Sequence, residues 1–371
     1  MKELKVAIIG CGPRATRHAG TYANIDNARV VACCDMSKAE ADNFAKKYEC
    51  KPYLDPTEMI KEINPDIVHI VTPSFTHAEM LEIVCSLNVP ACQCEKPLCV
   101  GVKDYNRIKK ALTTSKTKII VNHQFRYHRD LIKCAEAVTS GKLGKIRYCE
   151  FSCGMSMNQQ GTHILDYVSK LMGDPGIVSV YGAAGEPDAL EPRHPAPKGT
   201  VAQVKFDNGV YGTWVTGETA PLVVHDGTTF KHCREAVYCE KGWVTYEEFG
   251  EWRIVSPEGE ESGVIEFAEG GGDAETQMSE STTEWDREND AAQERLTLSL
   301  IEWLKDDSKV SPSSIDHALD EWNAVLALYQ SSLTGEIVNL PFDPPEDLFE
   351  KMDLMKYVDP VFKEYVEREI K

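Results

Sequence analysis

Short apolar runs alternate with longer stretches of helical periodicity in roughly the first 120 residues of the chain. The short runs, rich in β-branched residues, predict strands, and the longer stretches predict helices. Alternating strands and helices build right-handed βαβ units, which form a doubly wound parallel sheet. The expected strands are Lys5–Ile9, Arg29–Cys34, Asp66–Val71, Ala91–Cys94 and Lys118–Val121. The expected helices are Pro13 to about Tyr22, Lys38–Tyr48, Pro56–Ile63, His77–Leu87 and Val102–Thr113.

The pattern changes near residue 145, where alternating runs begin to turn back on themselves. In one hairpin, Thr200–Phe206 and Val210–Thr216 flank Asn208-Gly209, a pair that favours the positive φ angles of a tight turn. A second hairpin is expected to turn at Glu240-Lys241-Gly242. Such runs are typical of antiparallel sheets. The sequence therefore predicts an α/β domain over residues 1–122 and an α+β domain with a large, mainly antiparallel sheet over residues 123–371.

The last third of the chain begins with an acidic stretch, Glu266–Asp290, which contains glycine and few apolar residues. It predicts an exposed loop, interpreted as a solvated excursion rather than a functional lid. Beyond it, Leu296, Leu300 and Leu304 recur at helical spacing and predict a helix that faces the core. A second helix is expected from Ser313 or Ser314 to Gly335. Its expected core residues are Leu319, Trp322, Leu326 and Tyr329.

Composition places the chain among globular proteins of two-domain size. Its 371 residues exceed the usual size of one domain, and 42% hydrophobic and 27% charged residues are ordinary for a globular protein. The formal net charge of −19 repels nucleic acid and anionic membranes, so neither is an expected partner. No apolar run approaches the roughly 20 residues of a membrane span. We therefore expect a cytoplasmic protein that binds a small molecule.

Thirteen cysteines are scattered along the chain. Neighbours such as Cys33-Cys34 do not resemble a secreted disulfide framework, so reduced thiols are expected. The sequence has no C-x-x-C unit, and we expect no metal site. Buried cysteines that act as small apolar residues account for the pattern.

A glycine-rich segment, Gly10-Cys11-Gly12-Pro13-Arg14-Ala15, follows the first predicted strand. It is a G-x-G-x-x-A variant of the dinucleotide-binding fingerprint. Gly10 permits the tight turn, Gly12 lets a pyrophosphate approach the backbone, and Ala15 keeps the helix close to the sheet. Proline suits the first helical position, because the N–H that it lacks would have no partner there. We expect Gly10, Gly12, Pro13 and Arg14 to contact the cofactor.

Asp35 ends the second predicted strand, about 20 residues beyond the fingerprint. A carboxylate at this position can accept hydrogen bonds from the adenosine ribose and would repel a 2′-phosphate. Asp35 therefore favours NAD over NADP as cofactor. The alternative is an ordinary turn or cap residue after a strand.

The segment Cys94-Glu95-Lys96-Pro97-Leu98 ends the fourth predicted strand, at the sheet edge where such domains bind ligands. The ammonium of Lys96, placed beside a carbinol, could orient the carbinol oxygen for hydride loss. The alternative is that Lys96 is an ordinary surface lysine before a proline. Here the sequence resembles the Gfo/Idh/MocA family of NAD(P)-dependent sugar and inositol oxidoreductases. In that family a Glu-Lys-Pro motif lies beside the nicotinamide. The resemblance implies that Lys96 contacts both the cofactor ribose and the substrate hydroxyl.

Further segments match the same family in order along the chain. Val71–His77 is similar to a wall of the cofactor pocket, and Gln124–Tyr127 is similar to the segment that meets nicotinamide and substrate. Gly144–Ile146 and Leu340–Phe342 resemble the entry to the second domain and the C-terminal ending. The resemblance implies cofactor contacts by Thr72, Pro73, Ser74, His77, Glu95, Lys96 and Gln124. It implies substrate contacts by Arg126, Gln159, His163 and Tyr167.

The family's second catalytic signature appears as Gly161-Thr162-His163-Ile164-Leu165-Asp166. By resemblance His163 reaches the substrate as proton acceptor or donor, a role that suits the titration range of histidine. The alternative is a buried core or cap histidine. Sugar dehydrogenases of the family often carry aspartate four positions before this histidine, where this chain has Gln159. An amide can orient the imidazole but cannot raise its proton affinity as a carboxylate would; Asp166, one turn beyond, could compensate.

These features together predict an NAD-dependent oxidoreductase that transfers hydride between the cofactor and a secondary hydroxyl or ketone of a sugar, glycoside or cyclitol. Lys96 would orient the hydroxyl, and His163 would move its proton. Two alternatives stay open: a redox-assisted enzyme that retains NAD while it cleaves or eliminates a glycoside, and an NAD-binding sensor without catalysis. The resemblance also implies a homodimer or homotetramer.

Overall fold

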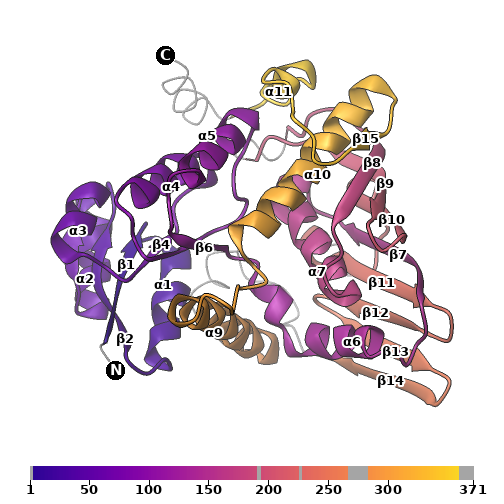
Figure 1. Cartoon of the computed structure of the whole chain (residues 1–371), viewed down its shortest axis with the longest axis horizontal. Coiled ribbons are helices and arrows are strands. Elements are labelled where there is room, and N and C mark those ends of the chain that lie inside the picture. Colours follow the sequence, from indigo (N-terminus) through magenta and orange to yellow (C-terminus); the bar gives the residue numbers. More distant parts are fainter. Residues whose placement is uncertain (1–2, 190–193, 225–227, 266–282, 359–371) are drawn as a thin grey trace. The chain divides into compact units, whose positions relative to one another are not determined.

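The computed structural model describes residues 3–189, 194–224, 228–265 and 283–358 (Figure 1). These residues form two compact units, and each unit draws on separate segments of the chain. The first unit comprises residues 3–99, 103–127 and 283–318 of the described chain, and the second unit comprises the rest. In this division residues 283–318 belong to the first unit, although most residues of the second unit precede them in the chain.

Six parallel strands form the sheet of the first unit in the order β3-β2-β1-β4-β5-β6. This is the order of a doubly wound Rossmann sheet, which changes direction between β1 and β4. The bounds are β1 Leu4–Ile9, β2 Ala28–Cys34, β3 Lys51–Tyr53, β4 Ile67–Ile70, β5 Ala91–Cys94 and β6 Lys118–Val121. The five predicted strands are confirmed. The sequence missed β3, a short edge strand whose central Pro52 lacks an N–H and so suits a sheet edge.

Three helices of the first unit begin where their sequence signals predict. Pro13 and Pro56 occupy first-turn positions, while the side chains of Ser37 and Asp55 accept hydrogen bonds from the backbone N–H of Glu40 and Glu58. The bounds are α1 Pro13–Gly20, α2 Lys38–Tyr48, α3 Pro56–Ile63, α4 His77–Ser86, α5 Val102–Leu112 and α9 Glu284–Lys305. Short helical turns cover η1 Thr21–Ala23, η2 Ser74–Thr76 and η3 Gln124–Tyr127.

Helix α9 corrects the expectation of a loop over Glu266–Asp290. Residues 266–282 lie outside the described residues, but residues 284–290 form the first turns of α9. Thr283 and Asp286 cap this helix reciprocally, and Asp286 and Asp290 also pair with Arg17 of α1 at 3.4 and 2.5 Å. The acidic side chains of this part of the stretch thus serve a helix cap and ion pairs.

The apolar face of α9 joins the core of the first unit. Leu296 and Leu300 are fully buried in one cluster with Val6 and Ile8 of β1, as the helical spacing of the leucines predicted. Each fully buried leucine contributes about 1.5–3 kcal/mol relative to an exposed one. This burial holds α9, which is distant in the sequence, against the parallel sheet of the first unit.

Nine strands form the sheet of the second unit in the order β14-β13-β12-β11-β7-β10-β9-β8-β15. Among the strand pairs of the described residues in this sheet, only the β10 and β7 pair is parallel, which confirms the prediction of a mainly antiparallel sheet. The bounds are β7 Ile146–Cys153, β8 Ile177–Ala184, β9 Gly199–Phe206, β10 Tyr211–Gly217, β11 Cys233–Cys239, β12 Trp243–Glu247, β13 Glu251–Ser256, β14 Gly259–Val264 and β15 Val338–Asn339.

Both predicted hairpins of this sheet are confirmed. Gly209 takes φ +85° at the turn between β9 and β10, and the N–H of Cys239 donates to the Gly242 carbonyl across the turn between β11 and β12. On β9 and β10, Ala202, Val204 and Trp214 are buried, whereas Val201 and Tyr211 are 46% and 44% exposed. One face of the sheet is therefore core, and the other carries exposed apolar side chains.

Helices cover the core face of this sheet. Helix α6 (Arg129–Thr139) packs on β12 and β13, and α7 (Thr162–Met172) packs on β7 and β11 (Figure 1). Helix α10 (Ile315–Thr334) buries Leu319, Trp322, Leu326 and Tyr329 and ends before Gly335 at φ +70°, as predicted. The remaining short helices are the π-helical turn η4 (Met157–Gly161), η5 (Thr229–Lys231) and α11 (Leu348–Lys351).

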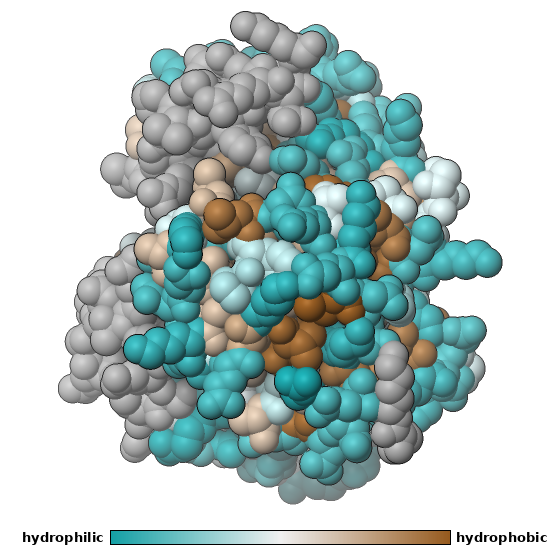
Figure 2. All heavy atoms as spheres, turned by 90° about the vertical axis from the view of Figure 1, so that its left-hand side faces the viewer, coloured by the Kyte–Doolittle hydropathy of each residue, from teal (hydrophilic) through white to brown (hydrophobic). Residues whose placement is uncertain are grey.

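The surface seen in Figure 2, on the side of α2 and α3, is mostly hydrophilic with a few apolar groups between the polar side chains. Within the described part of the chain, no helix is both long enough and apolar enough to span a membrane. All thirteen cysteines are free thiols, and eleven are buried, as the sequence predicted for small apolar residues. Burial raises the pKa of thiols such as Cys92.

Candidate functional site

The fingerprint segment makes a tight turn between β1 and α1. Gly10 has φ +95°, and a Cβ there would lie 2.3 Å from the carbonyl oxygen of Val71, so the turn requires glycine. A Cβ on Gly12 would meet nothing within 4 Å, and α1 begins at Pro13 without a side-chain cap. Open space at an uncapped helix N-terminus fits the pyrophosphate of a dinucleotide.

Asp35 follows β2 directly, beside the fingerprint turn. Its Oδ2 accepts a hydrogen bond from the Cys11 N–H at 2.9 Å, and its Oδ1 accepts one from the Ser37 N–H at 2.8 Å. The carboxylate therefore ties the end of β2 to the fingerprint. Each oxygen keeps a second lone pair, which a ribose hydroxyl could use.

We expect wild-type protein to bind NAD at least about tenfold more tightly than NADP, because the Asp35 carboxylate would lie against the 2′-phosphate. Asp35→Ser should narrow this ratio, measured by calorimetric titration of each cofactor. Asp42→Ser, which removes an exposed carboxylate of α2, is the control and should leave the ratio unchanged. Equal affinity of the wild type for the two cofactors would remove Asp35 from this role.

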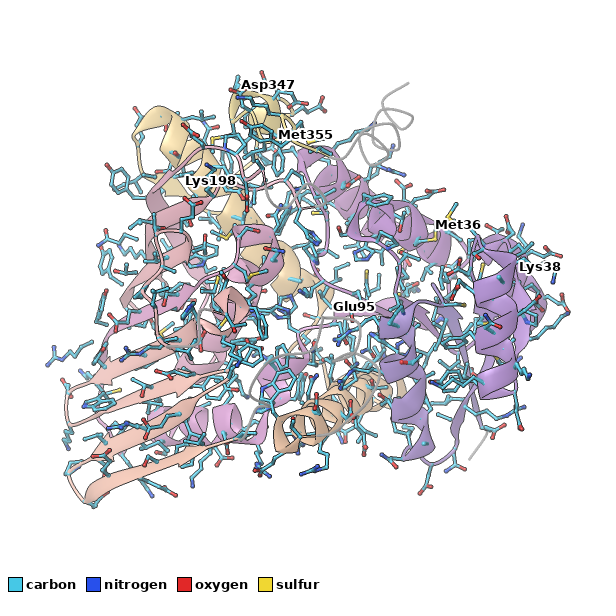
Figure 3. The ribbon with its side chains drawn as sticks, turned by 180° about the vertical axis from the view of Figure 1, so that it is seen from behind. Met36, Lys38, Glu95, Lys198, Asp347 and Met355 are labelled. Atoms are coloured by element: carbon cyan, nitrogen blue, oxygen red, sulfur yellow. The ribbon has the colours of Figure 1, made fainter. Side chains whose placement is uncertain are left out.

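Glu95, at the end of β5, accepts several hydrogen bonds through its carboxylate (Figure 3). Its Oε1 accepts from Arg14 Nε at 2.7 Å, His18 Nε2 at 2.8 Å and Asn122 Nδ2 at 2.9 Å, and its Oε2 accepts from the Lys96 N–H at 3.2 Å. Burial alone would raise the pKa of Glu95, but the Arg14 guanidinium and His18 hold it well below its ordinary range. A charged Glu95 thus links helix α1 to the backbone of Lys96.

Two strand-end segments meet at the carboxyl edge of the sheet. Strands β4 and β5 are paired neighbours, and Thr72–Ser74 follows one while Glu95-Lys96 follows the other. His77, fully buried, lies between them with Nδ1 at 2.9 Å from the Pro97 carbonyl and Nε2 at 3.0 Å from the Thr72 carbonyl. Burial lowers the pKa of His77, while both carbonyls favour its protonated form. A neutral imidazole carries one N–H, so His77 donates to one of these two carbonyls and lies in contact with the other segment.

A polar layer beneath this edge was not foreseen from the sequence. Asn122 exchanges hydrogen bonds with Gln293 of α9 at 2.8 and 3.1 Å, and its Oδ1 also accepts from Gln93 Nε2 at 2.7 Å. With its amide oxygen turned toward Arg14, Gln124 accepts from Nη2 at 2.9 Å. Polar residues such as Gln93 inside otherwise apolar strands were the available signal for this layer.

In the second unit, His163 and Tyr167 lie one turn apart on α7. Their ring centroids are 5.7 Å apart, and their exposed fractions are 3% and 0%. Asp166 on the same helix is 1% exposed. Burial, with the nearby Glu248 carboxylate, raises the pKa of Tyr167 well above its ordinary value, so its hydroxyl stays neutral. The helix thus brings an imidazole and a neutral phenol to one side of the unit.

Gln159 lies in the π-helical turn that precedes α7, not in a regular α-helical turn. Its Oε1 accepts from the Ser156 N–H at 3.4 Å, which is one half of a capping box, and also from Ser156 Oγ at 3.2 Å. The helical register that the sequence suggested between Gln159 and His163 is therefore altered by the extra residue of the π-turn.

The predicted site residues fall into two groups. The first unit holds the fingerprint residues, Asp35, the Thr72–Ser74 segment with His77, Glu95-Lys96, and the buried pair Gln124 and Arg126 at 2% and 1% exposure. The second unit holds Gln159, His163 and Tyr167. The predicted cofactor residues thus belong to one unit, and three of the four predicted substrate residues belong to the other.

Glu235 is a buried acid beneath α7 that sequence reasoning did not single out. It lies on β11 opposite Tyr246 of β12, is 0% exposed, and neither carboxyl oxygen has a hydrogen-bond partner among the described residues. Burial and the nearby Glu248 raise the pKa of Glu235 well above its ordinary value. The folded protein therefore holds a proton that the unfolded chain releases.

Because its folded-state pKa is raised, Glu235 makes folding less favourable as the pH rises above the unfolded value near 4.5. We expect Glu235→Gln to raise the free energy of unfolding by an amount that grows with pH, at most about 1.4 kcal/mol per pH unit. Urea unfolding at several pH values measures it, with the exposed Glu258→Gln as control. A gain independent of pH would contradict the protonated state.

Two family models and several curated proteins match this chain. The model of an oxidoreductase family with an NAD-binding Rossmann fold matches residues 4–123, and the model of that family's C-terminal alpha/beta domain matches residues 135–340. Myo-inositol 2-dehydrogenase of Thermotoga maritima is 29% identical over 38% of this chain and 42% of its own length. D-glucoside 3-dehydrogenase of Escherichia coli is 28% identical over 48% of this chain and 56% of its own length. The chain thus spans about half the length of these curated relatives.

The fold also matches solved structures. An oxidoreductase from Agrobacterium radiobacter, solved in complex with NAD+, L-tartaric acid and magnesium, superposes with a TM-score of 0.73 at 17% identity, over 91% of this chain and 98% of that one. At this identity the likeness concerns the fold. The two domain matches, which together span most of the chain, show that this protein belongs to the Gfo/Idh/MocA family of oxidoreductases and carries its NAD-binding Rossmann domain.

Proposed function

We propose that this protein is an NAD-dependent oxidoreductase that moves hydride between the cofactor and a secondary hydroxyl or ketone of a sugar, glycoside or cyclitol. The observation that carries the proposal is Glu95-Lys96 at the carboxyl edge of the sheet, the same edge as the fingerprint turn. An ammonium next to a dinucleotide site suits the orientation of a substrate oxygen.

The residues of the first unit fit the cofactor. The Gly10 and Gly12 turn and the N-terminus of α1 would hold its pyrophosphate, and Asp35 would hold its adenosine ribose. Bound NAD supplies the hydride acceptor. The Lys96 ammonium would donate a hydrogen bond to the substrate oxygen, and His163 would accept the hydroxyl proton. The chain's own task is to orient the carbinol and move its proton.

The substrate class rests on chemistry and on the relatives. The curated relatives act, by their names, on myo-inositol and on a D-glucoside, both of which are polyhydroxylated rings with secondary hydroxyls. Neutral polyols also suit a protein of net charge −19, which would repel anionic substrates at long range. We infer a neutral sugar, glycoside or cyclitol as substrate.

A substrate panel tests this proposal. Sugars, cyclitols and glycosides are incubated with the protein and excess NAD, and NADH is followed by its absorbance. We expect at least one member to give NADH in proportion to the substrate consumed. Glycoside cleavage without net NADH would point to the redox-assisted alternative. Absence of any conversion across the panel, with NAD bound, would contradict catalysis on neutral polyols.

We further propose a cytoplasmic homo-oligomer, a dimer or tetramer. Thirteen free thiols support a reducing compartment. Tyr181, Val201 and Tyr211 of β8 to β10 expose apolar surface at 48%, 46% and 44%, and burial against a second copy would remove it from water. Light scattering at micromolar concentration should report a dimer or tetramer, and Tyr211→Glu should shift it toward monomer. A stable wild-type monomer would contradict this proposal.

A further inference from the structure

A row of buried side chains runs from Glu95 into the first unit, and the proposed mechanism does not use it. Glu95 Oε1 lies 2.8 Å from His18 Nε2, and His18 Nδ1 lies 2.8 Å from His69 Nδ1. The other nitrogen of His69, Nε2, lies 2.6 Å from the Tyr22 hydroxyl. Both histidines are 0% exposed, and Tyr22 is 7% exposed. Four side chains from α1, η1, β4 and the end of β5 thus form one continuous chain.

The charge of Glu95 decides the direction of every hydrogen bond in this row. A carboxylate can only accept, so His18 donates through Nε2–H. Burial lowers the pKa of His18, so this imidazole is neutral and its Nδ1 is an acceptor. His69 must then donate through Nδ1–H.

The same reasoning continues to the end of the row. Burial, together with His18, lowers the pKa of His69 well below its ordinary value, so this ring is also neutral and its Nε2 accepts. The Tyr22 hydroxyl therefore donates, and burial keeps its pKa raised. All three hydrogen bonds point toward Glu95, and both tautomers are fixed.

We propose that Tyr22, His69 and His18 are positioning residues that fix the Glu95 carboxylate in one charged orientation and, through it, the Arg14 side chain and the Lys96 backbone. Arg14 donates to the same Oε1 at 2.7 Å, and the Lys96 N–H donates to Oε2 at 3.2 Å. The row therefore connects the fingerprint helix with the strand end that carries Lys96. This inference rests on the proposed function in one respect only, which is the role given to Lys96.

The row also opposes protonation of His18. A second proton on His18 would require His69 to accept through Nδ1 and donate through Nε2, and the Tyr22 hydrogen would lose its present acceptor. The charged groups that face this part of α1 are Arg14 and Glu95, with Arg17 paired to Asp286 and Asp290 of α9. A protonated His18 would compete with Arg14 for Glu95 Oε1 and loosen the link.

Ring-nitrogen NMR of 15N-histidine protein tests the row directly. In wild-type protein His18 should carry its proton on Nε2 and His69 on Nδ1, and both should stay neutral around pH 7. In Tyr22→Phe, which removes the terminal donor, the midpoint of the His18 titration should rise by about one pH unit, the equivalent of one hydrogen bond. Tyr48→Phe is the matched control, because the Tyr48 hydroxyl donates to the Thr16 carbonyl outside the row.

Binding and kinetics supply the second readout. The ratio of the NADH affinity of wild-type protein to that of Tyr22→Phe should change as the pH falls below 7. In the same pH range, kcat/KM of Tyr22→Phe should fall about threefold to tenfold relative to wild type. Tyr48→Phe should show neither change. A wild-type His18 protonated on Nδ1, or a Tyr22→Phe protein that behaves like Tyr48→Phe, would overturn the proposal. The NMR and NADH arms need no substrate, so they stand even if no polyol is oxidised.

Discussion

Replacing Lys96 with methionine is expected to lower turnover on the best polyol by roughly 100-fold or more, while the affinity for NADH changes little. Methionine keeps the length of the side chain and removes the ammonium that would hold the substrate oxygen. The Lys96 N–H donates to Glu95 through the main chain, so this contact survives the change. The loss should therefore fall on the chemical step rather than on cofactor binding.

Kinetics and NADH fluorescence titration, measured on the same preparations, separate the two effects. Lys38→Met is the control, because Lys38 is an exposed lysine of α2 paired with Asp42. Lys38→Met should behave as wild type in both measurements. Near-normal turnover of Lys96→Met would show that this ammonium does not act on the carbinol.

Replacing His163 with alanine is expected to lower turnover by a similar factor, roughly 100-fold or more, because the imidazole would accept the hydroxyl proton. His163 is 3% exposed, so alanine leaves a space in which free imidazole can act. Added imidazole should therefore restore part of the activity of His163→Ala, and the restoration should grow with the unprotonated fraction of imidazole.

The size-matched variant His163→Asn separates proton transfer from packing. Asparagine fills much of the space but cannot take the proton, so His163→Asn should be as slow as His163→Ala and should not respond to imidazole. Near-normal turnover of either variant would remove His163 from the proton path. Equal rescue of both variants would mean that imidazole acts elsewhere.

Features coded by neighbouring residues could be predicted from the sequence. The buried strands β4 and β5 are visible in the sequence as short apolar runs. Pro13 and Ser37 mark the starts of helices, because each suits the backbone at a helix N-terminus. The fingerprint turn followed from Gly10, whose positive φ and close approach to Val71 leave no room for a side chain. Each of these signals depends on only a few neighbouring residues, so it can be recognised without knowledge of the fold.

Features that depend on distant partners could not be predicted in this way. The first turns of α9 looked like part of an acidic loop, because the partner of Asp286 and Asp290 is Arg17, far away in the sequence. The π-turn at Gln159 interrupts the regular α-helical spacing, and it changed the spacing to His163. The His18–His69 contact joins a helix to a strand and leaves no periodic pattern.

The proposed reaction transfers the carbinol hydrogen to NAD, and a single-turnover experiment with labelled substrate can follow that hydrogen. The best polyol of the panel, deuterated at the carbon that bears the reacting hydroxyl, is mixed with NAD and an excess of the protein, and the dinucleotide is examined by mass spectrometry. We expect reduced cofactor that carries one deuterium and an oxidised product that has lost it. Substrate conversion with deuterium retained in the product and no label in the dinucleotide would contradict it.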